Sequence, residues 1–217
     1  TIRNNRLWTA RNVAVNSAGT SSNADRVACE WFEINVSTGT PSLVQNGRIF
    51  DTAVSDPRHY YYPAIMVNGQ GHAVIGFSGS KSTELVGAYY SGRLVSDVPG
   101  TMGEPVLLKA GTGSYVQLDG SGRNRWGDYS HTTLDRSDNM SLWTVQEYAE
   151  TNGSVVNGTT SRWGTRVAKL LSLPPTLNAP ATVEVQRGNT GVTLNLTGTN
   201  FYDPGAGFTN RLTAQFT

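Results

Sequence analysis

Apolar and polar positions alternate along most of the chain. The stretches RLWTARNVAV (6–15) and RVACEWFEINV (26–36) show the pattern clearly. A period of two places successive side chains on opposite faces, which is typical of a β-strand. No segment shows a convincing helical spacing of about 3.6 residues between apolar positions, so we predict an all-β fold. The predicted strands are 6–15, 26–36, 41–51, 60–68, 72–80, 84–94, 128–135, 140–149 and 163–173.

The predicted strands form three groups of three, separated by glycine-rich polar linkers such as DVPGTMGEP (97–105). Asn68-Gly69, between two strands of the second group, favours a tight hairpin. Each group has an inner strand, a middle strand with a central aromatic residue, and a more polar outer strand. Repeated multistrand units of about 40–50 residues suggest antiparallel β-propeller blades, with a β-sandwich as the alternative. The central aromatic residues are Trp31 with Phe32, Phe77 and Trp143.

Residues 174–217 differ from the preceding chain. They open with the proline-rich stretch PPTLNAP, alternate cleanly in VTLNLTGTNF (192–201), and contain no tryptophan. Domain boundaries fall in such polar, proline-containing stretches. We expect a boundary between Leu173 and Pro175, so that residues 1–173 and 174–217 form separate domains.

Composition and charge exclude several classes of protein. The formal net charge is +1 and only 15% of residues are charged, so no basic field attracts nucleic acid. No apolar run approaches the roughly 18 residues of a membrane span. Cys29 is the only cysteine, which excludes an internal disulfide and a cysteine-based zinc site. Its place in an alternating strand predicts a buried, inert thiol.

The stretch RWGDYS (125–130) places a guanidinium, an indole, a carboxylate and a phenol just ahead of a predicted strand. One interpretation is a glycan- or anion-binding site, in which the guanidinium grips a carboxylate and the indole stacks on a sugar. The tyrosine run 60–62 could extend such a site, or could simply pack on the next unit. The candidate ligand-binding residues are Arg125, Trp126, Asp128, Tyr129, Tyr61, Arg162 and Trp163.

The same stretch can instead be a structural corner. Arg-Trp-Gly returns at residues 162–164, and corners recur in every unit, whereas a catalytic site is usually built once. We favour this interpretation. It predicts that both tryptophans are largely buried, and that both arginines donate to backbone carbonyls or to a carboxylate such as Asp128.

Oxygen-bearing side chains gather in DRSDN (135–139), a composition that suits calcium, which takes about six to eight oxygen ligands. The glycine and the distant glutamate of an EF-hand are not placed here. A hairpin turn capped by its own Asp and Ser side chains is therefore the favoured interpretation. DPGAG (203–207) presents the same choice. We predict no cofactor, with calcium as the alternative.

Three stretches together carry a family resemblance: residues 60–80, 125–149 and RWGTRVAKL (162–170). They resemble the C-terminal blades of secreted bacterial sialidase-like propeller proteins of the BNR type. This resemblance implies about three propeller blades from an extracellular or cell-surface protein. Because about four to eight blades close a propeller, it also implies a fragment, or further blades upstream.

Two shorter motifs add to the resemblance. SDNMSLW (137–143) is similar to the Asp-box pattern Ser-x-Asp-x-Gly-x-Thr-Trp, with Asn139 where the pattern has Asp and Ser141 where it has Gly. LNLTGTNFYDPGAGFTNRLTAQF (194–216) resembles the opening half of an IPT/TIG immunoglobulin-like domain. That second resemblance implies that residues 174–217 begin an Ig-like β-sandwich.

The resemblance also says what a working sialidase would need: an arginine triad, a tyrosine–glutamate nucleophile pair, an acid Asp and an Arg-Ile-Pro motif. Arg48-Ile49 is followed by Phe50, so that motif fails. Glycoside hydrolysis in general needs two facing carboxylates. Five acids are candidates for this pair by residue type alone: Asp128, Asp135, Glu30, Glu33 and Glu147.

We therefore expect a non-enzymatic secreted or cell-surface module, which binds glycan or another extracellular protein or assembles with copies of itself. One alternative is a fragment of a sialidase-like glycoside hydrolase. A structural subunit of an extracellular filament is another, because an incomplete propeller leaves an exposed sheet edge. We also expect Trp143, at the centre of a middle strand, to be buried between sheets.

Overall fold

The computed structural model describes residues 1–127, 129–151, 161–171, 173–178, 188, 190–191 and 197–203. All regular elements in these residues are strands, which confirms the predicted all-β class. They are β1 (Ile2–Arg3), β2 (Arg6–Val15), β3 (Arg26–Asn35), β4 (Ser42–Ile49), β5 (His59–Val67), β6 (Ala73–Lys81), β7 (Glu84–Arg93), β8 (Val106–Lys109), β9 (His131–Leu134), β10 (Leu142–Glu150), β11 (Arg162–Leu170), β12 (Thr176–Leu177) and β13 (Gly198–Thr199).

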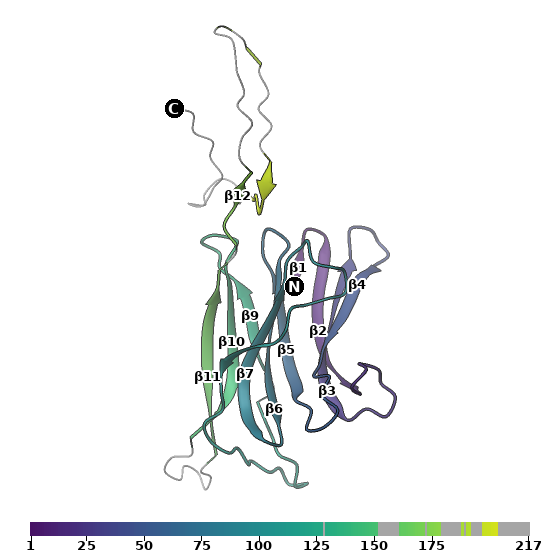
Figure 1. The fold of residues 1–217 in the computed structure, drawn as a ribbon, viewed down its shortest axis with the longest axis vertical. Helices are drawn as coiled ribbons and strands as arrows, with labels where there is room; N and C mark the ends of the chain where they lie inside the picture. The colour runs from purple at the N-terminus through teal and green to yellow at the C-terminus, as the bar shows by residue number, and fades with distance from the viewer. Residues whose placement is uncertain are drawn as a thin grey trace.

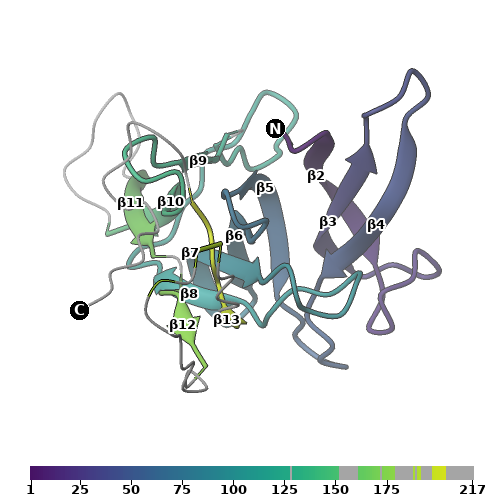
Figure 2. The same cartoon turned by 90° about the horizontal axis from the view of Figure 1, so that it is seen from above.

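The strands form three antiparallel meanders in chain order. The first sheet is β1-β2-β3-β4, the second β5-β6-β7-β8 and the third β9-β10-β11, while β12 pairs with β13. The three sheets stand side by side (Figure 1). Seen end-on, β5 lies between β2 and β9 and contacts both (Figure 2). The three predicted groups of strands are thus three sheets, and β8 is a fourth strand of the second sheet that the sequence pattern missed.

The predicted Asn68-Gly69 turn joins β5 to β6. The Asn68 side-chain oxygen Oδ1 accepts the N–H groups of Gln70 and His72, each at 3.0 Å. The residue with a left-handed backbone is Gly71, at φ 86°, where a residue without Cβ avoids strain. The hairpin is confirmed, and its left-handed position is two residues later than Gly69.

The apolar core lies between the first and second sheets. Trp8 and Trp31 stack with ring centroids 5.7 Å apart, and the second sheet contributes Phe77 and Tyr60, which meet edge to face at 5.1 Å. Such pairs add to the stabilisation that buried aromatic area already provides. Cys29 belongs to the same cluster, and burial raises the pKa of its thiol well above the ordinary value. The thiol is buried, as predicted.

The interface between the second and third sheets is polar by comparison. Thr144 and Gln146 of β10 are fully buried there, and Thr132 of β9 donates to the Ala64 carbonyl at 2.8 Å. A Cβ at Gly76 would lie closer than van der Waals contact permits to Nε2 of Gln146 and Oγ1 of Thr144. The third sheet therefore approaches the second so closely because position 76 has no side chain.

The expectation that Trp143 is buried between sheets is wrong. Its neighbours Leu142 and Thr144 are buried and Trp143 itself is half-buried, because successive strand residues take opposite faces. Its indole N–H donates to Oδ2 of Asp135 at 3.0 Å. The Lys169 ammonium lies 5.4 Å from the ring centroid. Trp143 thus packs under a salt-bridged pair on the outer face of the third sheet.

Part of the chain beyond Pro174 lies on the turn between β5 and β6. Tyr202 accepts hydrogen bonds from the Asn139 side chain and from Arg3, and Gln70 donates to the Asn200 carbonyl at 2.7 Å. Figure 1 shows β12 beyond one end of the three sheets. The rest of the predicted Ig-like segment lies outside the described residues, so the boundary at 173–175 stays a prediction.

Candidate binding site

The most unusual backbone in the second sheet is at Tyr62. The ladder between β5 and β6 shifts register between Tyr61 and Ala64, and within this bulge Tyr62 has φ 56°. A bulky residue in the left-handed region is strained, typically by about 1–3 kcal/mol. Such strain persists only where the surrounding structure fixes it.

Both neighbouring sheets hold Tyr62 in this conformation. Asn12 of β2 accepts the Tyr62 N–H through Oδ1 at 2.9 Å. Ser130, just before β9, donates its hydroxyl to the Tyr62 carbonyl at 2.6 Å. The strained residue of the second sheet is therefore fixed by one side chain from the first sheet and one from the segment that enters the third.

Two adjoining recesses open beside Tyr62. One lies between β2 and β5, and the other extends toward Tyr129, whose side chain is 85% exposed. Arg11 and Asn12 line the second recess as well. These groups bring two phenols, an amide and a guanidinium to one surface. We call this surface the tyrosine platform and define it as Arg11, Asn12, Tyr62 and Tyr129.

The charge beside the platform comes from a network around Glu30. Arg11 donates to its carboxylate at 2.8 Å through Nε, and Arg48 donates at 2.8 Å from the other side. Burial acts to raise the pKa of the Glu30 carboxyl, but hydrogen bonds and charges from the two guanidiniums outweigh it and the pKa is lowered. Glu30 is 3% exposed and Arg11 64% exposed. The network therefore presents a guanidinium, not a carboxylate, to solvent.

Two of the sequence-predicted residues lie at these recesses: Tyr61 and Tyr129. The Tyr61 hydroxyl pairs with Ser80 at 2.9 Å, and burial raises its pKa to about 12. Asp128 lies outside the described residues. The tyrosine run 60–62 singled out Tyr61, and the mixed chemistry of RWGDYS singled out Tyr129, whereas nothing local pointed to Asn12 or Arg11.

Arg125 and Trp126 do not line the platform recesses. Trp126 is half-buried, donates its indole N–H to Ser78 at 3.3 Å, and packs its ring against Tyr115 with centroids 4.9 Å apart. One guanidinium nitrogen of Arg125 lies 3.9 Å from Asp119. The Trp126 indole therefore has two protein partners: Ser78 binds its N–H, and Tyr115 packs against its ring.

The second copy of the motif behaves differently. Trp163 was expected to be largely buried, and this is wrong, because 53% of it is exposed. It lies with Arg162 on β11, which forms the edge of the third sheet among the described strands. Arg162 is exposed as well. The repeated sequence does not produce a repeated environment.

In DRSDN (135–139), the two aspartate side chains accept hydrogen bonds from backbone N–H groups of the turn. Oδ1 of Asp138 accepts the N–H groups of Met140 and Ser141, at 2.9 and 2.8 Å, while Asp135 accepts from Ser137, Trp143 and Lys169. Both carboxylates thus organise the turn, and Asp138 lies one residue before the position expected from the Asp-box pattern. Asn139, at the expected position, has φ 57°.

A second charged cluster, which the sequence analysis missed, caps the core at one end of β5 and β7. Arg58 binds Glu84 through two nitrogens, at 3.0 and 2.6 Å, and the Tyr89 hydroxyl donates to Glu84 at 3.5 Å. The hydrogen bond from Arg58 lowers the pKa of Glu84, and burial raises the pKa of Tyr89. Near neutral pH, Glu84 is therefore ionised and paired with Arg58, while Tyr89 is protonated.

Comparison with known proteins gives no relative for this chain: no family model, curated protein or solved structure matches it. Among the described residues, no three His, Cys, Asp or Glu side chains gather as a metal ion would require. The same residues contain no helix with the length and apolarity to cross a membrane.

Proposed function

We propose that this chain is a non-enzymatic module of an extracellular or cell-surface protein and that it binds a glycan at the tyrosine platform. The observation that carries the proposal is Tyr62, a strained residue that Asn12 and Ser130 fix from two sides beside the exposed ring of Tyr129. Backbone strain that several elements maintain is typical of binding and catalytic sites. The Tyr62 ring also packs edge to face against Tyr61, with centroids 5.8 Å apart.

The chemistry of the platform suits a sugar. Tyrosine rings offer apolar faces on which the C–H face of a pyranose packs, and their hydroxyls remain available for hydrogen bonds. The Arg11 guanidinium and the Asn12 amide supply donors at the rim. A ligand with both apolar faces and hydroxyl groups would use all four residues.

The state of Glu30, which lies beside the platform, favours binding over hydrolysis. A glycosidase needs one carboxylic acid whose pKa is raised, and a second carboxylate across the cleft. The residues that line the recesses in the described part of the chain include no Asp or Glu. The nearby Glu30 has a lowered pKa and is held by two arginines, so it is a poor proton donor.

We also propose that the three sheets are propeller blades, in line with the BNR-type resemblance. In support, three consecutive antiparallel meanders follow one another along the chain, and β5 runs between β2 and β9. The tyrosine platform then lies where the inner strands of neighbouring blades meet. An extracellular location is part of the same proposal.

A glycan array, followed by titration calorimetry with the best-bound oligosaccharide, tests the function. Tyr129→Ala should weaken binding about fivefold, because stacking contributes about 1 kcal/mol. Trp163→Ala removes another exposed aromatic residue, on the edge strand β11 and outside both recesses, and should leave the affinity unchanged. Equal losses in both variants, or no bound glycan, would count against the proposal, and release of reducing sugar would favour a hydrolase.

A further inference from the structure

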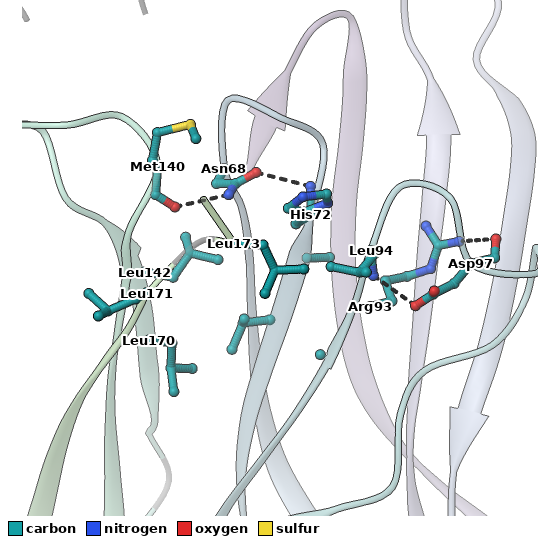
Figure 3. A pocket seen from close by; sticks show the side chains of 13 residues that line it. Asn68, His72, Arg93, Leu94, Asp97, Met140, Leu142, Leu170, Leu171 and Leu173 are labelled. Carbon is teal, nitrogen blue, oxygen red and sulfur yellow. Dashed lines mark hydrogen bonds between the residues drawn. The ribbon is translucent and has the colours of Figure 1, made fainter. Parts of the chain in front are cut away.

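A separate apolar cavity of about 210 Å³ opens between the second and third sheets, beside the start of β6 and the start of β10. Leucines from β10, β11 and the segment after β11 gather around it (Figure 3). Met140, Leu94 and two residues of β6 complete the apolar wall. The apolar lining residues are Ala73, Val74, Leu94, Met140, Leu142, Leu170, Leu171 and Leu173.

Polar groups also line this cavity, and most are used by the protein itself. The Asn68 side chain accepts from His72 N–H and donates to the Met140 carbonyl at 2.9 Å. The Arg93 guanidinium donates to the carbonyls of Thr101 and Asp97, at 3.1 Å each. Neither residue has to leave its protein partners for the cavity to be filled.

His72 is the exception. Its Nδ1 accepts the Val95 N–H at 3.0 Å, so the neutral ring carries its proton on Nε2. Nε2 is buried and has no hydrogen-bond partner in the described part of the chain. His72 is only 7% exposed, and a buried donor without an acceptor costs free energy that native proteins rarely leave uncompensated.

We infer that this cavity binds an uncharged, mostly apolar small molecule whose single hydrogen-bond acceptor receives the Nε2–H of His72. An apolar protein cavity of about 150 Å³ holds benzene, so the present one has room for a somewhat larger ring or short branched chain. A charged ligand is disfavoured because most of the wall is apolar and its two charged side chains already have protein partners. The Arg93 guanidinium donates to two carbonyls, and the Asp97 carboxylate accepts the Leu94 N–H at 2.8 Å. The site is independent of the tyrosine platform and of the glycan proposal.

Acetophenone and cumene are matched probes for this site. They have nearly the same size and shape, but only acetophenone has a carbonyl acceptor. Each is titrated into the full chain and followed by the leucine methyl signals of the NMR spectrum. We expect both probes to shift the methyl signals of Leu142 and Leu170.

The variant His72→Asn separates the hydrogen bond from the cavity. The Asn side-chain oxygen can replace Nδ1 as the acceptor for Val95, while the donor at Nε2 is lost. We expect acetophenone to bind the variant about five- to tenfold more weakly and cumene to change less than twofold. A parallel loss for both probes would overturn the role of His72.

Leu171→Trp provides a second, independent test. Leu171 is 76% exposed, so the larger side chain can close the cavity without disturbing the core. Both probes should lose binding in this variant while the thermal midpoint stays unchanged. If neither probe binds the natural chain at millimolar concentration, the cavity holds only water and the inference is wrong.

Discussion

At the residue scale, charge and strain mark the first half of β5 and the residue before it. Tyr62 holds a backbone conformation that a tyrosine disfavours, and Arg58 is locked to Glu84 a few residues earlier. Neither feature follows from its own stretch of sequence. Asn12, which fixes Tyr62, is 50 positions away in the chain. The sequence predicted tyrosines of interest here, but only the pairing of distant strands shows which one is strained.

The strain at Tyr62 can be measured with two substitutions. Tyr62→Ala and Tyr62→Gly both remove the phenol, so they lose the same side-chain contacts. Glycine adopts the left-handed region without the Cβ clash, which costs about 1–2 kcal/mol in other residues. We expect the glycine variant to be more stable than the alanine variant by about 1 kcal/mol in urea unfolding. An alanine variant of equal or greater stability would show that position 62 is unstrained.

The network around Glu30 predicts a pH dependence of stability. Its pKa is lowered in the folded state, relative to an ordinary value of 4.5. The unfolded chain therefore binds the proton more readily. The stabilisation is present above about pH 4.5 and is lost as pH falls through the lower folded pKa.

Unfolding in urea at pH 7 and at pH 3.5 tests this dependence. Glu30→Gln should lower stability at pH 7 by about 1–3 kcal/mol, because two arginines lose their charged partner, and should lose less than the natural chain on acidification. Glu104→Gln changes an exposed glutamate and serves as the control. An unchanged acid dependence in the Glu30 variant would contradict the network.

At the element scale, alternation located the strands well but did not tell which face is inside. Trp31 and Trp143 both lie on middle strands, yet Trp31 is fully buried and Trp143 is half-buried. A period of two defines two faces, and only the neighbouring sheets decide between them. β8 was missed for a different reason: it is four residues long, and so short a run within a glycine-rich linker has too little alternation to detect.

The two tryptophans should differ in their energetic contribution. Trp31→Ala should cost about 3–5 kcal/mol, as other buried aromatic truncations do. Trp143→Ala should cost clearly less, about 1–2 kcal/mol, because Trp143 is only half-buried and its truncation exposes less apolar area. Chemical denaturation of both variants measures the difference. Equal losses would mean that another surface covers Trp143.

The close approach of the second and third sheets depends on Gly76. Gly76→Ala should destabilise the chain by about 1–3 kcal/mol, since a methyl group there pushes against Gln146 and Thr144. A Cβ at Gly39 would meet nothing within 4 Å, so Gly39→Ala is the matched control and should have little effect. Thermal unfolding of the two variants measures this difference. Equal midpoints would show that the two sheets accommodate a methyl group at position 76 without loss of stability.

At the scale of the whole molecule, the three meanders have similar topology, but the two interfaces between them differ in composition. The first and second sheets enclose the aromatic core, while the second and third meet through buried polar side chains. The tyrosine platform lies where β2, β5 and the segment before β9 come together. The sequence predicted three groups of strands, but not this convergence, because it depends on how separate sheets pack.

The most direct test of the central claim is a backbone NMR titration with the best-bound oligosaccharide from the array. A glycan at the tyrosine platform should shift the amide signals of Tyr62, Tyr129 and Ser130 and the side-chain amide of Asn12, while Trp163 and its neighbours on β11 stay in place. Shifts concentrated away from these residues, or no saturable shift at all, would contradict the account.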